Sequence, residues 1–290
     1  MRSLFPIAAI LLGSIFDVAH QYSGAIRFLL MLMLFAAFIE LRFDRLYKSF
    51  HNHVFFIVAA NFILSFLWYL LLAPFDIMSA QIAFLTAISP TATAAPAMVG
   101  FWRGNVEYTT ISVILTNSAV ALAIPFLSVT LFQVEESVSS LEILRSVFIL
   151  IAIPLVLSQL WNQINRSIQW SVPWKALSFW AWIVLLFLAS AKTSHFIHYD
   201  TEVDFRSIVK IALFVILICT TNFSIGKQLG RSGFPRETSQ SLGHKNTMFT
   251  VWFSFSFLSP DLALGPMLYV VVQNIYNAYQ LSQIDRLSID

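Results

Sequence analysis

The sequence predicts an all-α membrane protein, and its composition, its apolar runs and its short loops support that fold class. Of the 290 residues, 58% are hydrophobic and 11% are charged, whereas a soluble domain carries about 25% charged residues. The apolar residues gather in runs that approach the roughly 20 residues needed to cross a bilayer as a helix. No loop between these runs is long enough for a separate folded module.

Ten such runs follow one another, and we expect each to form one transmembrane helix. The expected spans are Leu4–Ala19, Ser23–Phe43, His53–Ala73, Met78–Phe101, Tyr108–Phe132, Leu141–Trp161, Val172–Ser190, Arg206–Ile225, Glu237–Leu258 and Asp261–Gln280. The first span is short, so it requires a thinner bilayer or an interfacial end. It also resembles a signal peptide, but no cleavage site of small residues follows it, so we expect it to remain.

The positive charges predict which side of the membrane each loop faces, because cytoplasmic loops carry an excess of lysine and arginine. With the N-terminus inside, the cytoplasmic segments hold Arg2, Arg42, Arg45, Lys48, Arg103, Arg166, Lys175, Lys227, Arg231, Arg236 and Arg286. The outer segments and their edges hold only Arg27, Arg145, Lys192, Arg206 and Lys210. The sequence therefore predicts a multi-pass protein of a bacterial-type inner membrane with both termini in the cytoplasm.

Two of the expected helices are interrupted. The fourth contains Ser-Pro-Thr-Ala-Thr-Ala-Ala-Pro from Ser89 to Pro96, and each proline costs a helix roughly 3 kcal/mol or more. The ninth contains Gly243, His244, Lys245 and Asn246. A lysine at membrane depth costs roughly 2.5–3.5 kcal/mol on insertion scales, so it needs a partner or a water-filled cavity.

The two interruptions fall at matching positions, since each lies in the fourth helix of a five-helix half. Broken helices at corresponding places are typical of inverted-repeat transporters, so we expect two inverted repeats over residues 1–135 and 136–290. Prolines and hydroxyls also occur in ordinary membrane helices, where neighbours satisfy the backbone. Two breaks in register, one with a lysine, favour a transport site over that simpler interpretation.

Three motifs resemble those of the bile acid:sodium symporter superfamily, which are ten-helix secondary transporters of organic anions. Ser89-Pro90-Thr91-Ala92-Thr93 followed by Arg103-Gly104-Asn105-Val106 is similar to the family's C-P-G-G-T…R-G-N-V, Gly243-His244-Lys245-Asn246 is similar to its G-M-Q-N, and Asn61-Phe62 stands where Gln-Phe is usual. The resemblance implies a panel formed by the first, second, sixth and seventh helices beside a core in which the two broken helices cross. It also implies a small organic anion as substrate.

The resemblance extends to residues that contact substrate in the relatives, since Thr93 and Asn246 match two of them. We add Thr91, His244 and Lys245 to the expected substrate site because they lie within the same two breaks. The matches to sodium ligands are poorer. Those positions are Ala95, Pro96, Thr109, Val113, Ser241 and Lys245. Ala95, Pro96 and Val113 have no side-chain oxygen, and hard cations require oxygen ligands.

We therefore hypothesise that the Lys245 ammonium occupies the place of a sodium ion. A cation 4 Å from an ammonium is repelled by about 4 kcal/mol at an effective dielectric constant of 20, so sodium is the less expected partner. The expected ion-coupling residues are Lys245, Ser241, Asn61, Thr109 and Glu237. We expect Ser241 and Asn61 to donate hydrogen bonds to Lys245. Glu237 lies about 12 Å away along an unbroken helix, too far for direct pairing.

Several functions remain open at this level. Burial disfavours a charged lysine, so Lys245 either carries a proton in each cycle or stays charged in a facilitator or exchanger. A sodium-coupled symporter and a non-transporting receptor or sensor on the same fold are the alternatives. The chain has no H-E-x-x-H, G-x-S-x-G, P-loop or Cys/His metal spacing. We therefore expect no enzyme activity, cofactor or metal site, and no nucleic-acid partner because there is no basic patch.

Overall fold

The computed structural model describes residues 4–39, 51–132, 139–168, 170–199 and 205–287. These residues form α1 (Leu4–Ile15), η1 (Asp17–Tyr22), α2 (Ala25–Ile39), α4 (His53–Leu72), α5 (Ile77–Ile88), α6 (Ala95–Phe101), α7 (Val106–Phe132), α8 (Ser140–Ile168), α9 (Trp174–Tyr199), α10 (Phe205–Leu229), α11 (Pro235–Gly243), α12 (Thr247–Phe257), η3 (Pro260–Ala263) and α13 (Leu264–Leu287). The described part of the chain is all-α, and its one β-type pairing is an isolated bridge between Thr91 and Lys245.

Five of the described helices are long and apolar enough to cross a membrane: His53–Leu72, Val106–Phe132, Ser140–Asn165, Trp174–Tyr199 and Arg206–Leu229. Four shorter apolar helices accompany them, at Phe5–Ile15, Ala25–Ile39, Ile77–Ile88 and Thr247–Phe257. The prediction of an all-α membrane protein is therefore confirmed, whereas the arrangement as ten spans in two inverted repeats stays a prediction. Arg2, Arg42, Arg45 and Lys48, which contribute to the predicted orientation, lie outside the described residues.

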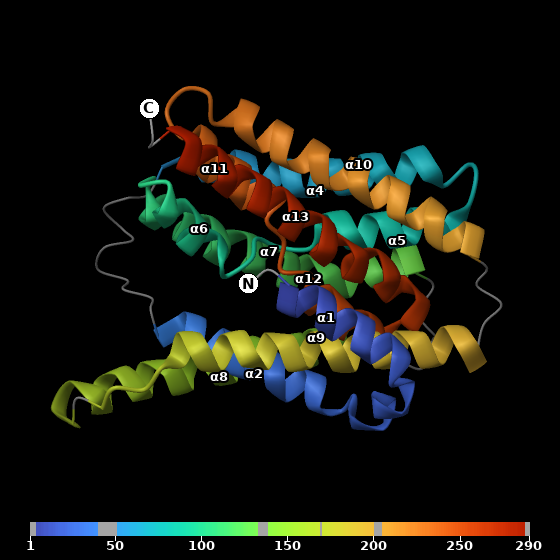
Figure 1. Cartoon of the computed structure of the whole chain (residues 1–290), viewed down its shortest axis with the longest axis horizontal. Helices are drawn as coiled ribbons and strands as arrows, with labels where there is room; N and C mark the ends of the chain where they lie inside the picture. The colour runs from blue at the N-terminus through green and yellow to red at the C-terminus, as the bar shows by residue number, and fades with distance from the viewer. Residues whose placement is uncertain (1–3, 40–50, 133–138, 169, 200–204, 288–290) are drawn as a thin grey trace.

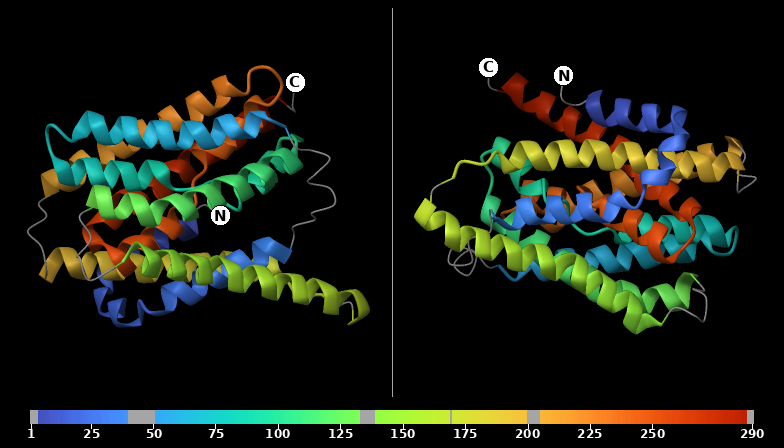
Figure 2. Two further views of the ribbon diagram at one scale, coloured as in Figure 1. Left: turned by 180° about the vertical axis from the view of Figure 1, so that it is seen from behind. Right: turned by 90° about the horizontal axis from the view of Figure 1, so that it is seen from below.

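The helices form two layers (Figure 1). The panel consists of α1, α2, α8 and α9, in which α1 packs on α9 and α2 packs on both α8 and α9. The core consists of α4 to α7 and α10 to α13. The view from behind in Figure 2 shows the core on one side of the molecule and the panel on the other. Contacts of α7 with α8, and of α12 with α2 and α9, join the two layers.

The outward surfaces of several helices are apolar. Exposed large hydrophobic side chains include Phe55, Phe56, Ile63, Leu67, Leu70 and Leu71 on α4, Phe148, Ile153, Val156, Leu157 and Leu160 on α8, and Leu213, Ile216 and Leu217 on α10. Apolar patches of this extent on a protein mark contact with a membrane or a partner. Because these helices are also long enough to span, we assign the surface to lipid.

Some helix ends differ from the predicted ones. The seventh span was expected to end at Ser190, but α9 continues to Tyr199, and its Lys192 ammonium lies 4.6 Å from the centre of the Phe255 ring. A long lysine stem can pack on apolar surface inside a span while its charge contacts an aromatic face. The prediction placed Lys192 at a loop edge because it weighed charge alone, and it was wrong about that boundary.

Candidate functional site

Both predicted interruptions are present, and local sequence explains the first. α5 ends at Ile88 because Ser89 precedes Pro90 and takes ψ 130°, outside the helical region, as the residue before a proline prefers. α6 then begins at Ala95, with Pro96 in the first turn, where the missing N–H of proline is not needed. In the second interruption α11 ends at Gly243 and α12 begins at Thr247.

The two interruptions cross and pair with each other through their backbones. The Ala92 N–H donates to the His244 carbonyl at 2.8 Å, and the Asn246 N–H donates to the Pro90 carbonyl at 2.7 Å. Buried backbone groups need partners, and no helix supplies them here. Each unwound segment therefore satisfies polar groups of the other, which fixes the bridge between Thr91 and Lys245.

The Lys245 side chain lies at the C-terminus of α5. It is 2% exposed, and its Nζ donates to the Ala87 carbonyl at 2.9 Å and to Asn61 Oδ1. Asn61 Nδ2 donates in turn to the Ile88 carbonyl at 3.0 Å. The last carbonyls of a helix have no partner within the helix and carry its negative dipole end. A buried ammonium is therefore compensated by a helix terminus and an amide.

No carboxylate pairs with this ammonium among the described residues. Two ion pairs lie elsewhere in that part of the chain and join Lys210 to Asp76 and His195 to Asp17. An ammonium has three N–H donors, and the two bonds to Ala87 and Asn61 leave one without a protein partner in the described part of the chain. The Lys245 side chain thus has one N–H donor at the crossing that no described protein group accepts.

The long helix that follows each broken helix, α7 after α6 and α13 after α12, holds the bridging residue by its backbone. In α7, Thr116 Oγ1 accepts from the Thr91 N–H at 3.1 Å and Asn117 Nδ2 donates to the Thr91 carbonyl at 2.9 Å. In α13, Gln273 Oε1 accepts from the Lys245 N–H at 2.9 Å and its Nε2 donates to the Lys245 carbonyl at 3.3 Å. Both bridging residues are therefore bonded at donor and acceptor alike.

The C-terminus of α11 is capped in the same manner as that of α5. Thr91 Oγ1 donates to the Ser241 carbonyl at 2.5 Å, and the Tyr269 hydroxyl donates to the Gly243 carbonyl at 2.7 Å. The side chain of each bridging residue thus reaches the terminal carbonyls of the opposite broken helix: Lys245 reaches α5, and Thr91 reaches α11. These reciprocal hydrogen bonds join the two broken helices at their interruptions.

The remaining predicted substrate residues lie in or beside the crossing. Thr93 is half-buried in the first interruption, and Asn246 is buried at the start of α12. His244 Nδ1 lies 3.1 Å from Gln240 Oε1, and Gln240 donates to Asn277 Oδ1 and Gln280 Oε1 on α13. His244 therefore belongs to a hydrogen-bond network between α11 and α13 rather than to the partners of Lys245.

The structure brings together only part of the predicted ion-coupling set. Asn61 contacts Lys245, but as an acceptor through Oδ1 and not as the expected donor. The Ser241 hydroxyl is buried without a hydrogen-bond partner among the described residues, so the expected bond from Ser241 to Lys245 is missing. Ser241 contributes to the crossing through its backbone carbonyl, which accepts from Thr91 Oγ1.

Glu237 and Thr109 lie at a separate cluster near the turn between α6 and α7. Glu237, 6% exposed, accepts from the Asn105 N–H at 2.7 Å through Oε1, and Thr109 Oγ1 donates to the Asn105 carbonyl at 3.3 Å. Glu237 approaches Gly104 so closely that a Cβ there would overlap its carboxylate. Glu237 lies at the start of α11, away from Lys245, and its hydrogen bond with Asn105 joins α11 to the turn between α6 and α7.

Sequence reasoning missed two partners of the crossing. The Ala87 carbonyl is a backbone group, so no side-chain pattern could reveal it. Tyr269 was also missed, because an aromatic residue in an apolar helix reads as packing. The polarity of Thr116, Asn117 and Gln273 within otherwise apolar helices is the sequence signal that indicates which residues of α7 and α13 face the crossing.

Comparison with known proteins identifies the family. The sequence model of the Sodium Bile acid symporter family matches residues 27–202, more than half of the chain. The match contains the first interruption and ends before the second one, which holds Lys245. No curated protein matches the chain. With its long apolar helices, the chain is a multi-pass integral membrane protein that belongs to the sodium bile acid symporter family of membrane transporters.

Proposed function

We propose that the protein is a secondary transporter of small organic anions that works by alternating access of panel and core, with the Lys245 ammonium in place of a coupled sodium ion. One observation carries this proposal: Lys245 Nζ is buried at the crossing, bonded to Asn61 and to the Ala87 carbonyl at 2.9 Å. An ionisable side chain at membrane depth is costly, and such residues mark substrate and ion pathways. The protein lies in an inner membrane with both termini in the cytoplasm.

The reciprocal bonding at the crossing supports two inverted five-helix repeats over residues 1–135 and 136–290. Thr91 and Lys245 each cap the opposite broken helix. Each is held by the long helix that follows its own broken helix, α7 for Thr91 and α13 for Lys245. Corresponding interruptions near the middle of two halves are where such transporters bind substrate. On this arrangement the panel and the core are the two bodies that move.

The charge at the crossing supports an anionic substrate. No carboxylate among the described residues neutralises Lys245, and α12 begins directly after Asn246, so its positive dipole end faces the same interruption. Asn246 and Thr93 supply polar groups beside this charge. A carboxylate or sulfonate with an apolar body fits one positive charge set among apolar helices.

The same charge disfavours sodium near Lys245. Repulsion between a sodium ion and an ammonium at 4 Å is about 4 kcal/mol at an effective dielectric constant of 20, and Ala95 and Pro96 offer no side-chain oxygen. Because Lys245 has no carboxylate partner, it can release its proton without breaking an ion pair, which favours proton coupling. The printed name of the family favours a second candidate, sodium-coupled uptake with backbone carbonyls as ligands.

Uptake into proteoliposomes tests the proposal. Keto acids, sulfonates and sterol conjugates are first screened for a rise in the melting temperature of the purified protein, and the best anion is used for flux. We expect Lys245→Met and Lys245→Gln to lower uptake about ten-fold or more, the loss of one ionic contact of about 1.4 kcal/mol. Lys245→Arg, which keeps the charge, is the control.

Separate assays identify the coupling. An imposed pH gradient drives uptake by the wild type but not by Lys245→Gln if this lysine carries the proton. If the pH gradient drives uptake equally well in the wild type and in Lys245→Gln, then Lys245 does not carry the proton. Uptake that requires an inward sodium gradient in the wild type supports the second candidate instead.

A further inference from the structure

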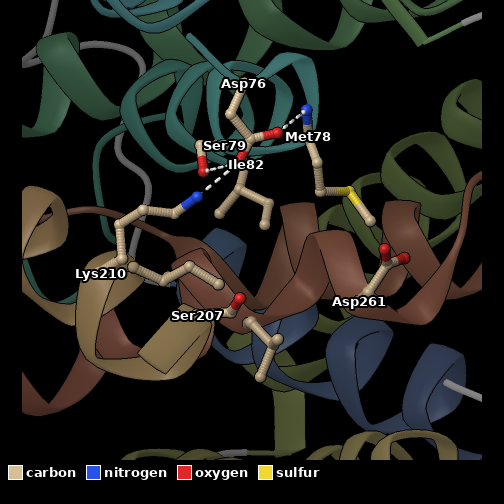
Figure 3. Close-up of a pocket in the computed structure, with 9 residues that line it drawn as sticks. Asp76, Met78, Ser79, Ile82, Ser207, Lys210 and Asp261 are labelled. Carbon is tan, nitrogen blue, oxygen red and sulfur yellow. Dashed lines mark hydrogen bonds and ion pairs between the residues drawn. The ribbon is translucent and has the colours of Figure 1, made fainter. Parts of the chain in front are cut away.

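A pocket lies at the end of the core where the turn before α5, the start of α10 and η3 meet (Figure 3). Its polar lining residues are Asp76, Ser79, Ser207, Lys210 and Asp261. α5 separates this pocket from the crossing, and its 12 residues span about 18 Å at 1.5 Å per residue. The pocket is therefore distinct from the site around Lys245.

One side of the pocket is internally satisfied. Asp76 accepts hydrogen bonds from the Met78 N–H at 3.1 Å, from Ser79 Oγ at 2.6 Å and from Lys210 Nζ at 2.5 Å. The bond to Met78 caps the N-terminus of α5. The charges of Asp76 and Lys210 cancel each other, and neither needs a further counter-ion.

The other side of the pocket is not satisfied. Asp261, on η3, is 4% exposed, and its Oδ1 has no hydrogen-bond partner among the described residues. Figure 3 shows its carboxylate directed from η3 toward the end of the Met78 side chain. Leaving an oxygen of a buried carboxylate without a partner costs free energy, and proteins compensate buried carboxylates with a cation. The charges of the lining residues therefore sum to one uncompensated negative charge.

We infer that this pocket binds a monovalent inorganic cation through the Asp261 carboxylate. The lining offers carboxylate and hydroxyl oxygens, which hard cations prefer, and it offers no imidazole or thiolate. One uncompensated negative charge matches one positive charge, whereas a divalent ion would leave a positive excess beside Lys210. Bound there, the ion would link η3 to the start of α5. The inference does not depend on the role proposed for Lys245.

Thermal unfolding of the detergent-solubilised full chain tests the inference. NaCl, KCl and LiCl each replace N-methyl-D-glucamine chloride at constant ionic strength, so that general screening of charges does not change. We expect the melting temperature to rise with the concentration of at least one of these cations, as ligand binding to the folded state requires. Asp261→Asn removes this response, and Glu107→Gln, a carboxylate outside the pocket, retains it.

A built-in cation provides a second test that does not require Asp261→Asn to fold. The end of the Met78 side chain faces the Asp261 carboxylate, so Met78→Lys places an ammonium beside that carboxylate. Met78 is partly exposed, so its position accepts a lysine. We expect this variant to melt higher than the wild type in cation-free buffer and to lose the cation response. Met78→Gln is the matched control and keeps the response.

Three outcomes would overturn the inference. They are a wild type whose melting temperature does not change with any of the three cations, a cation response that persists in Asp261→Asn, and a cation response that persists in a folded Met78→Lys. Because none of these measurements uses transport, they are separate from the test of the Lys245 proposal. Transport without a cation response would contradict only the inference about Asp261. A cation response without transport would contradict only the proposal about Lys245.

Discussion

The Lys245 ammonium donates a hydrogen bond of 2.9 Å to the Ala87 carbonyl, 158 residues earlier in the chain. This contact places a positive charge at the negative dipole end of α5. It also joins the two interrupted helices through a side chain as well as through the backbone.

Removal of the ammonium should destabilise the crossing. Lys245→Met leaves the Ala87 carbonyl and Asn61 Oδ1 buried without that donor, and each unsatisfied group costs about 1–3 kcal/mol. Chemical unfolding in detergent should report this loss. Asn61→Leu with Lys245→Met should cost less than the sum of the single changes, because the double variant removes both partners. Additive costs would contradict the coupling.

A carboxylate at position 61 should neutralise the site without disturbing its shape. Asn61→Asp pairs directly with Lys245, so we expect anion uptake to fall about ten-fold or more, equivalent to about 1.4 kcal/mol. The expected stability change is small, since the new ion pair offsets the lost bond to the Ile88 carbonyl. Initial uptake rates at matched protein density measure the effect. Unchanged uptake would show that the charge of Lys245 does not attract the substrate.

A methyl group at the end of α11 should collide with α10. A Cβ on Gly243 would overlap the Phe223 ring, and overpacking of a core costs about 1–3 kcal/mol. Gly243→Ala should therefore lower the melting temperature, and Phe223→Leu in the same chain should restore part of it. Gly24→Ala is the matched control, because a Cβ there meets nothing within 4 Å.

Gln273 on α13 should stabilise the backbone of Lys245, whereas its neighbour Asn274 should not. Gln273→Leu leaves the backbone N–H and carbonyl of Lys245 without their partners, at about 1–3 kcal/mol for each group. Asn274→Leu is the control, since the bond that Asn274 Nδ2 donates among the described residues goes to the Val270 carbonyl of its own helix. Unfolding free energies should differ between the two variants. Equal losses would mean that Gln273 acts only through general packing.

The pair of Asp76 and Lys210 should give a small, acid-sensitive contribution to stability. Burial opposes ionisation of Asp76, but hydrogen bonds from Lys210 and Ser79 outweigh it and lower its pKa from 3.8. The contribution is therefore present above pH 3.8 and is lost as the pH falls through the lower folded-state pKa. Both side chains are partly exposed, so we expect about 0.2–1 kcal/mol. The wild type and Asp76→Asn should differ in unfolding free energy at pH 6 and converge in strong acid.

Much of the fold was predictable, because membrane solvation acts on composition and length. Apolar runs predicted the helices, and Pro90 predicted the end of α5, since the residue before a proline leaves the helical conformation. Helix ends near charged residues were less predictable, as the extension of α9 beyond Ser190 shows. A lysine stem packs on an aromatic ring as readily as it reaches a headgroup, and the sequence does not distinguish these cases.

The candidate site was predictable in its location and not in its bonds. Lys245 at membrane depth marked the second interruption. Ser241, Thr109 and Glu237 were expected to take part in ion coupling, although Glu237 was expected to lie too far from Lys245 for direct pairing. None of the three bonds to the Lys245 ammonium in the described part of the chain. The rigid rise of α11 takes Glu237 to Asn105 instead. Tyr269 and Ala87 could not be predicted, because one resembles a packing residue and the other acts through its backbone.

The sequence by itself determined that the chain spans a membrane, that two of its helices are interrupted, and that one interruption contains a lysine. Each of these properties follows from residue type and spacing, because a bilayer requires apolar helices whose backbone groups are satisfied internally. The tertiary structure decided which groups bond to that lysine. Backbone carbonyls are identical along every chain, so only the crossing of two distant segments could select Ala87, and only the end of its helix leaves that carbonyl free to accept.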